Sequence, residues 1–243
     1  MNGEFKKSLS LVIPAHNAEN IIENSVIEYN KIFSDFEEFE IIIVCNACSD
    51  RTFEVSKKLA EKYPILILNI PHRGKGNALR RGFNKAKYEN MGFLDSDNPF
   101  SLEKIKQMVN SLNEYDITIA TKYLKGSLKN KRGVKDSQIR RIIALGGQFF
   151  VRFLFGLKFR DTQAGAKFFR KNVWEKIGKD IICVGFDFDI EFLYRSKKQK
   201  FSIAEFYTPL IKYEKFSTVR IKYLIGMVYR LIKLRFLKWN QLF

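Results

Sequence analysis

Short apolar runs alternate with helix-like segments over the first half of the chain. The runs have the length and composition of buried strands, and they lie at residues 9–14, 40–44, 65–70, 91–94 and 117–123. Between them, helices are expected at residues 17–33, 52–63, 77–86 and 101–112. Strands and helices that alternate with short connections predict an α/β fold, with a mostly parallel central sheet and helices on both faces.

The second half of the chain has a less regular pattern. A basic stretch at residues 122–141 is expected to be a mobile loop, and the apolar segment that follows to residue 159 is helical in pattern. That helix would carry Arg141, Gln148 and Arg152 on one narrow stripe, so it is either packed in the core or partly in lipid. Residues 160–177 suggest a polar loop and a helix, residues 185–199 a helix, and residues 201–213 one or two short strands.

The tail from Val219 onward also has a helical pattern. One face is free of charge, and it consists of Ile221, Ile225, Val228, Ile232, Phe236 and Trp239. Basic residues occupy the rest of the circumference, which is typical of a helix lying at a membrane surface. The alternative is a helix docked on the protein's own core. For the membrane helix, cutting the chain at about Thr218 is expected to give a soluble protein.

The formal net charge of +17 is concentrated in two stretches of the 243-residue chain. Residues 122–141 and 212–238 each contain eight basic residues and one acidic residue, so together they carry +14 of that charge. Such patches attract nucleic acid, anionic lipid or a phosphorylated substrate. Three cysteines and two histidines leave little room for a structural zinc site. No signal peptide is expected before the first strand, and no apolar run approaches the ~20 residues needed to span a bilayer.

Two carboxylates follow the fourth predicted strand, in the sequence MGFLDSDN. Alternation along an extended chain would place Asp95 and Asp97 on the same side, where they could bind a divalent ion that also contacts a substrate diphosphate. Just upstream, Arg73, Lys75 and the glycine at position 76 lie where a loop enters a helix, a setting that favours anions. Both features fall at the sheet edge where open α/β sheets bind ligands. Taken singly, each is more often a turn or a helix cap than a ligand site.

Several of these motifs together resemble family 2 glycosyltransferases of the GT-A fold, specifically the dolichyl-phosphate glucose and mannose synthases. The resemblance covers about residues 8–219. Its motifs are LVIPAHNAEN, EIIIVCNACSDRT, RGKGNALRRGF, FLDSDN, DTQAGAKFF, FDIEFLY and Ser217–Val219. DTQAGAKFF is the most diagnostic of them.

The resemblance implies roles for individual residues. Pro14, His16, Cys45 and Asn46 would line the nucleotide pocket, with Lys75 and Gly76 near the base or diphosphate. Asp95 and Asp97 would hold ribose and a metal ion, Mg²⁺ or Mn²⁺. Lys122 and Arg140 would face phosphate, Gln163 would lie near the acceptor, and Asp189 and Glu191 match the family's F-D-x-E.

Four positions depart from the family pattern. Cys45 and Asn46 replace an Asp-Asp pair that reads the base and ribose, which leaves the nucleotide open between UDP and GDP. Ala18 stands where many members have Glu, and Pro99 replaces a polar residue of the metal shell.

The implied reaction is metal-dependent, inverting transfer of a hexose from a nucleoside diphosphate sugar to a polyprenyl (dolichyl) phosphate. Asp97 would hold the metal, Lys75 and Arg73 would add charge stabilisation, and Arg140 and Gln163 would position the acceptor. A phosphate acceptor is already anionic and needs no base.

Two alternatives remain. A sugar-hydroxyl acceptor would need a base, for which Asp189 or Glu191 are candidates. A nucleic-acid-binding protein would instead need a continuous basic groove.

The resemblance and the tail together imply a location and a domain division. The protein is expected to be peripheral on the cytoplasmic face of a membrane and to bind the lipid surface but no nucleic acid. Residues 1–215 would form the glycosyltransferase domain, and residues 216–243 a membrane-associated helical segment.

Overall fold

The computed structural model describes residues 7–97, 99–123, 138–209, 211 and 221–236. Most of the expected basic loop, the Ser217–Val219 motif and Trp239 lie outside these residues. The side chains of residues 138–145, 148 and 221–225 are likewise outside the description, and they include Arg140, Arg141, Gln148, Ile221 and Ile225.

Within the described residues, seven strands form one sheet in the order β3-β2-β1-β4-β6-β5-β7. Neighbouring strands run parallel except at β6, which is antiparallel to both β4 and β5. The bounds are β1 (Ser8–Ala15), β2 (Glu38–Asn46), β3 (Ile65–Ile70), β4 (Asn90–Leu94), β5 (Ile117–Thr121), β6 (Ala166–Arg170) and β7 (Ile203–Tyr207). The prediction of a mostly parallel α/β sheet is confirmed.

Strand β6 lies where the sequence suggested only a polar loop and a helix. Its five residues pair with β4 on one side and with β5 on the other. Lys167 interrupts the apolar pattern of the strand, yet its side chain is fully buried. A short run that contains a lysine gives too weak a period-2 signal to be recognised as a central strand.

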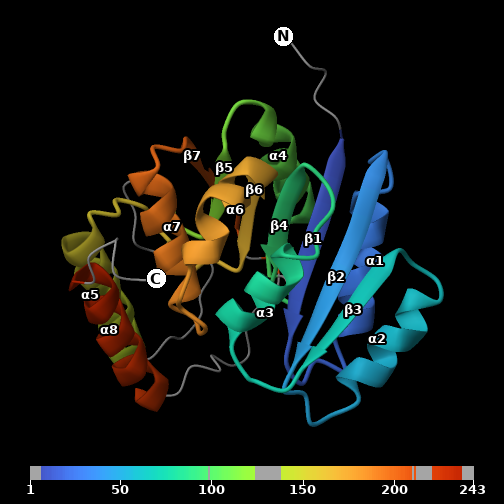
Figure 1. The fold of residues 1–243 in the computed structure, drawn as a ribbon, viewed down its shortest axis with the longest axis horizontal. Coiled ribbons are helices and arrows are strands. Elements are labelled where there is room, and N and C mark those ends of the chain that lie inside the picture. Colours follow the sequence, from blue (N-terminus) through green and yellow to red (C-terminus); the bar gives the residue numbers. More distant parts are fainter. Residues whose placement is uncertain (1–6, 98, 124–137, 210, 212–220, 237–243) are drawn as a thin grey trace.

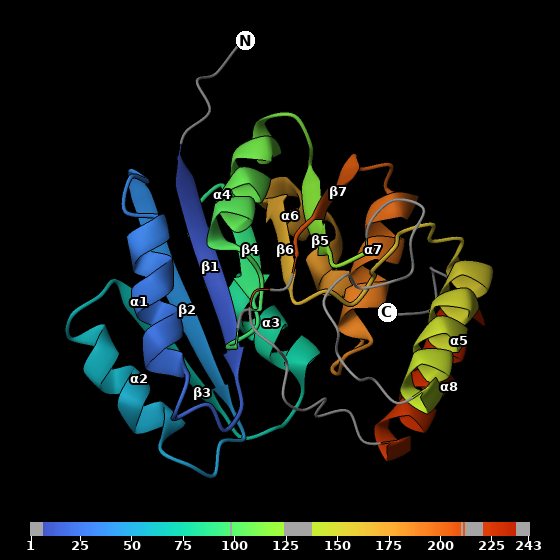
Figure 2. The ribbon, with the colours of Figure 1, turned by 180° about the vertical axis from the view of Figure 1, so that it is seen from behind.

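Helices cover both faces of the sheet (Figures 1 and 2). One face carries α1 (Ile22–Ile32), α2 (Thr52–Ala60) and α4 (Leu102–Asn110), and the other carries α3 (Lys75–Phe83), α6 (Lys171–Ile177) and α7 (Phe188–Lys198). Alternate residues of β2 enter the two cores: Ile41 and Ile43 pack toward α1 and α2, and Ile42 and Val44 toward α3. Burial on both faces explains why this strand reads as a continuous apolar run.

Helices α5 (Gln138–Phe155) and α8 (Ile221–Phe236) lie side by side beyond α7 in both views. Val151 and Phe155 of α5 and Leu231 and Leu234 of α8 are buried in the same core as α3 and α7. In the described part of the chain, the tail helix α8 therefore docks on the protein's own core, as the alternative interpretation of the sequence proposed.

The outer faces of the same two helices expose large apolar side chains. Phe149 and Phe153 on α5 are 72% and 82% exposed, and Tyr229 and Phe236 on α8 are 67% and 74% exposed. Val228 and Ile232 of the predicted charge-free face are also exposed. Among the described residues, no helix combines the length and the apolar character needed to cross a bilayer.

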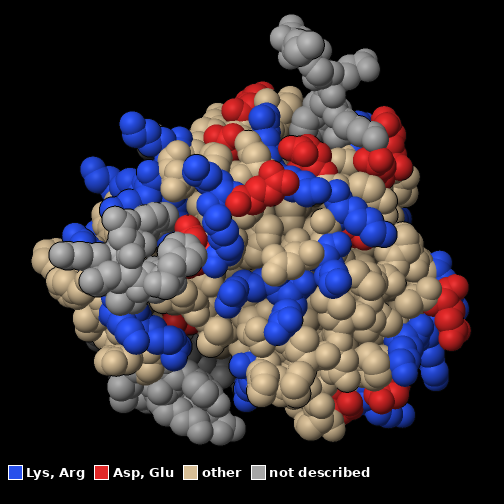
Figure 3. Space-filling model, in the orientation of Figure 1, with Lys and Arg blue, Asp and Glu red and all other residues tan. Residues whose placement is uncertain are grey.

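Basic side chains are not confined to the two stretches that stand out in the sequence. Figure 3 shows them spread across the face that carries α3 and α6, with acidic side chains between them. Exposed basic residues in this region include Arg81, Lys85, Lys176 and Lys179. The folding of the chain therefore brings together charges that the local counts do not reveal.

Candidate active site

Strands β4 and β6 bring Asp95 and Gly165 together at one edge of the sheet. Leu94 pairs with Ala166, and the Asp95 N–H donates a hydrogen bond to the Gly165 carbonyl oxygen at 2.9 Å. A Cβ atom at position 165 would lie 2.2 Å from Asp95 Oδ2. The glycine of the DTQAG motif is therefore required so that the Asp95 carboxyl group can lie against the backbone.

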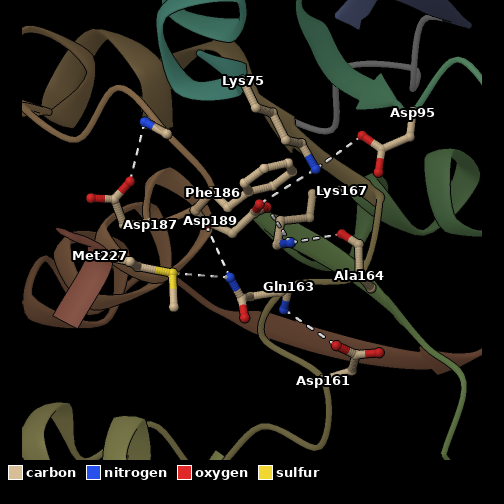
Figure 4. A network of polar contacts seen from close by, with 11 residues as sticks. Lys75, Asp95, Asp161, Gln163, Ala164, Lys167, Phe186, Asp187, Asp189 and Met227 are labelled. Atoms are coloured by element: carbon tan, nitrogen blue, oxygen red, sulfur yellow. Dashed lines mark hydrogen bonds and ion pairs between the residues drawn. The ribbon is translucent and has the colours of Figure 1, made fainter. Parts of the chain in front are cut away.

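Lys75, the first residue of α3, extends to the end of β4 and connects two carboxylates (Figure 4). Its Nζ atom lies 2.9 Å from Asp95 Oδ1 and 3.5 Å from Asp189 Oδ2. Burial alone would lower the pKa of Lys75, but the Asp189 and Asp95 carboxylates outweigh it and raise that pKa. Lys75 is thus a fixed positive charge beside Asp95.

Lys167 of β6 is a second buried cation in this network, and sequence reasoning assigned it no role. Its Nζ atom lies 2.6 Å from Asp189 Oδ1 and donates to the Ala164 carbonyl oxygen at 2.9 Å. Burial lowers the pKa of Lys167, and Asp189 offsets this only in part. The side chains of Lys167 and Asp189 are 0% and 1% exposed, so Asp189 neutralises two lysines and is not open to solvent.

Asp97 is the exposed carboxylate of the site. The strand ends at Leu94 and the chain turns at residues 96–97, so a turn rather than strand alternation places Asp97. Partial loss of hydration and the neighbouring Asp95 charge raise the pKa of Asp97. A carboxylate that is open to solvent and repelled by another carboxylate is chemically suited to bind a cation.

The sequence suggested that the first turn of α3 offers its N–H groups to an anion. In the structure, two of these groups already donate to the backbone. The N–H groups of Gly76 and Asn77 donate to the carbonyl oxygens of Gly185 and Val184, at 3.2 and 3.0 Å. A Cβ atom at position 76 would lie 2.5 Å from the Cys183 carbonyl oxygen. Gly76 therefore serves the close packing of α3 against this segment.

The ends of β1 and β2 carry the residues that are expected to line a nucleotide pocket. His16 Nδ1 donates to the Asn46 carbonyl oxygen at 2.9 Å, and Pro14 is half-buried in β1. The Asn46 amide donates to the Ala15 carbonyl oxygen at 3.0 Å and accepts from the Gly74 N–H at 2.9 Å. Asn46 thus connects three loops, and its role in reading a base stays a prediction. Cys45 does not line a pocket, because it is fully buried in the core near α1 and α2.

The loop before β6 places polar groups beside the lysines (Figure 4). Asp161 is buried and accepts from the Gln163 N–H at 3.3 Å. Burial raises the pKa of Asp161 more than the nearby Lys122 and Lys167 charges lower it. The Gln163 side-chain amide donates to the Phe186 carbonyl oxygen at 3.1 Å and lies 3.8 Å from Met227 Sδ on α8.

Glu191 has a structural role that the F-D-x-E pattern did not reveal. Its fully buried carboxylate accepts from the Ile182 and Cys183 N–H groups, at 3.0 and 2.7 Å. It also pairs with Arg195, 2.7 Å away. These contacts join α7 to the segment that precedes it, so Glu191 fixes the start of that helix.

The structure brings most of the predicted residues to this edge, but not all. Arg73 lies two residues before α3 and is exposed, so its side chain is open to a ligand, whereas Arg140 lies in α5 with its side chain outside the description. Within the described residues, no group of three or more His, Cys, Asp or Glu side chains is arranged to hold a metal ion. A role of Asp95 and Asp97 as metal ligands therefore stays a prediction, in which the ion would take its remaining ligands from water and substrate oxygens.

Comparison with known proteins gives the same family that the sequence motifs resemble. A model described as glycosyl transferase family 2 matches residues 10–178, well over half of the chain. The chain belongs to this family. Among solved structures, the family 2 domain is similar to glucosyl-3-phosphoglycerate synthase from Mycobacterium tuberculosis in complex with Mn²⁺, UDP and glucosyl-3-phosphoglycerate. The TM-score is 0.68 and the identity 18%, over 93% of this chain and 77% of that one, which establishes the shared fold.

Curated relatives of the family 2 domain include lipid-linked sugar transferases. It is 28% identical to glycosyltransferase AglD of Haloferax volcanii, over 82% of this chain and 32% of that protein. It is 27% identical to the human dolichyl-phosphate beta-glucosyltransferase, over 82% and 66%. It is 26% identical to the dolichol-phosphate mannosyltransferase of Pyrococcus furiosus, over 79% and 54%. The chain thus spans from about a third to about two thirds of these relatives.

Proposed function

We propose that this chain transfers a hexose from a nucleoside diphosphate sugar to a polyprenyl phosphate, with inversion at the anomeric carbon. The observation that carries the proposal is the fixed cation of Lys75, held between Asp95 and Asp189 next to the open carboxylate of Asp97. This arrangement suits a diphosphate leaving group. The names of the glucosyl and mannosyl relatives support the lipid phosphate acceptor.

In the proposed reaction the bond between the anomeric carbon and the diphosphate oxygen breaks, and its electron pair leaves with the nucleoside diphosphate. An acceptor phosphate oxygen forms the new bond on the opposite face of the sugar. Lys75 and Arg73 would stabilise the charge that develops on the diphosphate. Asp97, with Asp95 beside it, would hold Mg²⁺ or Mn²⁺, which when bound neutralises part of that charge. Pro14, His16 and Asn46 would hold a UDP or GDP moiety.

The acceptor side of the proposal depends on basic residues and on the ion pairs of the two carboxylates, Asp189 and Glu191, that were candidates for a base. Lys122 and Arg140 would hold the phosphate, and Gln163 would lie near it. A sugar hydroxyl would require a carboxylate base. Asp189 is paired with two lysines and Glu191 with Arg195, which supports a phosphate nucleophile over the hydroxyl alternative.

We further propose that the protein acts as a peripheral protein on the cytoplasmic face of a membrane. The exposed Phe149, Phe153, Tyr229 and Phe236 side chains support a contact with lipid. Binding of nucleic acid is not part of the proposal, because basic and acidic side chains are interspersed on the face seen in Figure 3.

The function can be tested with purified protein, a short-chain polyprenyl phosphate and a panel of labelled nucleotide sugars. We expect one donor to give an organic-soluble labelled product. Asp97→Ala and excess chelator should each abolish the product while the protein stays folded by circular dichroism. Full transfer in excess chelator would overturn the metal assignment, and labelling of a sugar hydroxyl in place of the lipid phosphate would favour the alternative acceptor.

A further inference from the structure

An ion pair joins Arg230 of the C-terminal helix α8 to Asp187, which directly precedes α7. Arg230 Nε donates to Asp187 Oδ2 at 2.5 Å, and a second guanidinium nitrogen lies 3.4 Å from Asp187 Oδ1. The Asp187 side chain is 0% exposed, whereas that of Arg230 is 41% exposed. A buried carboxylate with a charged partner on another helix is costly to leave unpaired. Asp187 and Arg230 are 43 residues apart, and sequence reasoning assigned neither a role.

The same carboxylate shapes the turn at residues 184–187. Asp187 Oδ1 accepts from the Gly185 N–H at 3.1 Å. A Cβ atom at position 185 would lie 2.8 Å from Asp187 Oδ1 and 3.3 Å from the Arg230 guanidinium. The turn is therefore built closely around the ion pair.

The 184–187 turn also binds two parts of the candidate active site, the start of α3 and the Gln163 side chain. The carbonyl oxygens of Gly185 and Val184 accept from the first-turn N–H groups of α3, at Gly76 and Asn77, directly after Lys75. The Phe186 carbonyl oxygen accepts from the Gln163 side chain, which also lies 3.8 Å from Met227 Sδ of α8 (Figure 4). Arg230 of α8 thus contacts the turn at Asp187, and Met227, one helical turn away, contacts Gln163.

We propose that Arg230 is a positioning residue: through Asp187 and the 184–187 turn, the docking of α8 sets the position of Lys75 and Gln163. The helix is then part of the catalytic unit, although the sequence had suggested a division at residue 215. The kinetic consequence rests on the proposed transfer reaction, whereas the structural link between α8 and α3 does not.

The test compares Arg230→Gln with Arg235→Gln in the full-length chain. Arg235 is on the same helix and donates to the Leu154 carbonyl oxygen of α5 at 3.0 Å, so both variants lose one charge and one inter-helix contact. Turnover is measured without vesicles, using a water-soluble short-chain polyprenyl phosphate. We expect Arg230→Gln to lower kcat by roughly a hundredfold, because small misplacements of catalytic groups have effects of this order. Arg235→Gln should keep the parent kcat.

Hydrogen exchange provides a readout that is independent of activity. The amides of Gly76 and Asn77 should exchange at least about tenfold faster in Arg230→Gln, and at the parent rate in Arg235→Gln. The double variant Asp187→Asn/Arg230→Gln leaves no unpaired charge but lacks the same ion pair, so it should keep most of the loss in kcat. Arg230→Lys should recover part of the kcat.

The outcomes separate the two proposals. Equal kcat and equal exchange in Arg230→Gln and Arg235→Gln would overturn the positioning role. If Arg230→Gln does not fold, the double variant decides, and a folded double variant with the parent kcat also overturns it. A parent chain that is inactive with every donor would refute the proposed function, and the exchange rates would then decide the link between α8 and α3 alone.

Discussion

At the scale of single residues, Gly165 leaves the space that the Asp95 carboxyl group occupies. We expect Gly165→Ala to displace Asp95, because the new Cβ atom would lie 2.2 Å from its Oδ2 atom. Such overpacking costs about 1–3 kcal/mol of unfolding free energy, and displacement of Asp95 should lower turnover by roughly a hundredfold. Urea unfolding and initial rates measure the two effects.

Gly147 provides the matched glycine for this experiment. A Cβ atom at that exposed position of α5 would meet nothing within 4 Å. Gly147→Ala should therefore raise stability by about 0.5–1 kcal/mol, through the lower entropy of the unfolded chain and the better helix propensity of alanine. If Gly165→Ala lowered neither the unfolding free energy nor the turnover, the inference that Asp95 packs closely against residue 165 would be wrong.

Asp189 neutralises two lysines that have little access to solvent. Replacing Asp189 should therefore change the stability of the fold. Asp189→Asn leaves Lys167 without its 2.6 Å partner, so we expect a loss of about 3–5 kcal/mol of unfolding free energy. Adding Lys167→Gln should recover part of that loss, which a double-mutant cycle in urea quantifies. A loss under about 1 kcal/mol in Asp189→Asn would contradict the pairing. Because stability changes in either case, turnover of this variant alone cannot distinguish phosphate from hydroxyl acceptors.

At the scale of elements, the loops after β1 and β2 are joined through Asp50. Its carboxylate accepts from the Glu19 N–H at 3.1 Å, from the Thr52 N–H at 3.1 Å and from the Thr52 hydroxyl. Desolvation would raise the pKa of Asp50, but these hydrogen bonds outweigh it and lower that pKa. The contribution of Asp50 to stability is therefore present above its unfolded pKa of 3.8, and it is lost as the pH falls through the lower folded value.

Asp50→Ala tests this connection between the two loops. We expect it to lower the unfolding free energy by about 1–2 kcal/mol at pH 7, the usual cost of removing an acceptor of several hydrogen bonds. The difference from the parent should stay constant down to about pH 5 and shrink below the ordinary aspartate pKa. Asp50→Asn, whose amide oxygen still accepts, should lose less. A difference that grows on acidification would contradict the assigned direction of the pKa shift.

The elements that the sequence predicts well are those with a strong local signal. A continuous apolar run predicts a strand buried on both faces, and the structure places its residues in two cores: Ile41, Ile42, Ile43 and Val44. Strand β6 carries a buried lysine, and its pattern gives no such signal. The lysine is tolerated only because Asp189, 22 residues away, neutralises it. Contacts of this kind depend on the assembled fold, as do the Glu191 contacts at the start of α7 and the Arg230–Asp187 pair.

At the scale of the whole molecule, the α5–α8 pair has one buried side and one apolar side open to solvent. We expect Tyr229→Ser/Phe236→Ser to weaken binding to anionic vesicles by roughly tenfold to a hundredfold, because both side chains are well exposed and available to lipid. The melting temperature should stay at the parent value, since neither side chain contributes to the core. Co-sedimentation with vesicles and thermal unfolding measure the two properties. Unchanged sedimentation would place the membrane contact elsewhere.

Removal of the whole helix should have a different result from the substitutions on its outer face. A chain ending at Thr218 loses Leu231 and Leu234, which are buried in the core together with Val151 and Phe155, and it leaves the Asp187 carboxylate without Arg230. Exposed apolar surface and an unpaired buried charge each reduce stability by several kcal/mol. We therefore expect the truncated chain to aggregate or to melt well below the parent, in contrast to the soluble product that the tail's composition alone suggested. Size-exclusion chromatography and calorimetry of the truncated chain decide the matter. A soluble monomer with the parent melting temperature would show that α8 is not needed by the rest of the fold.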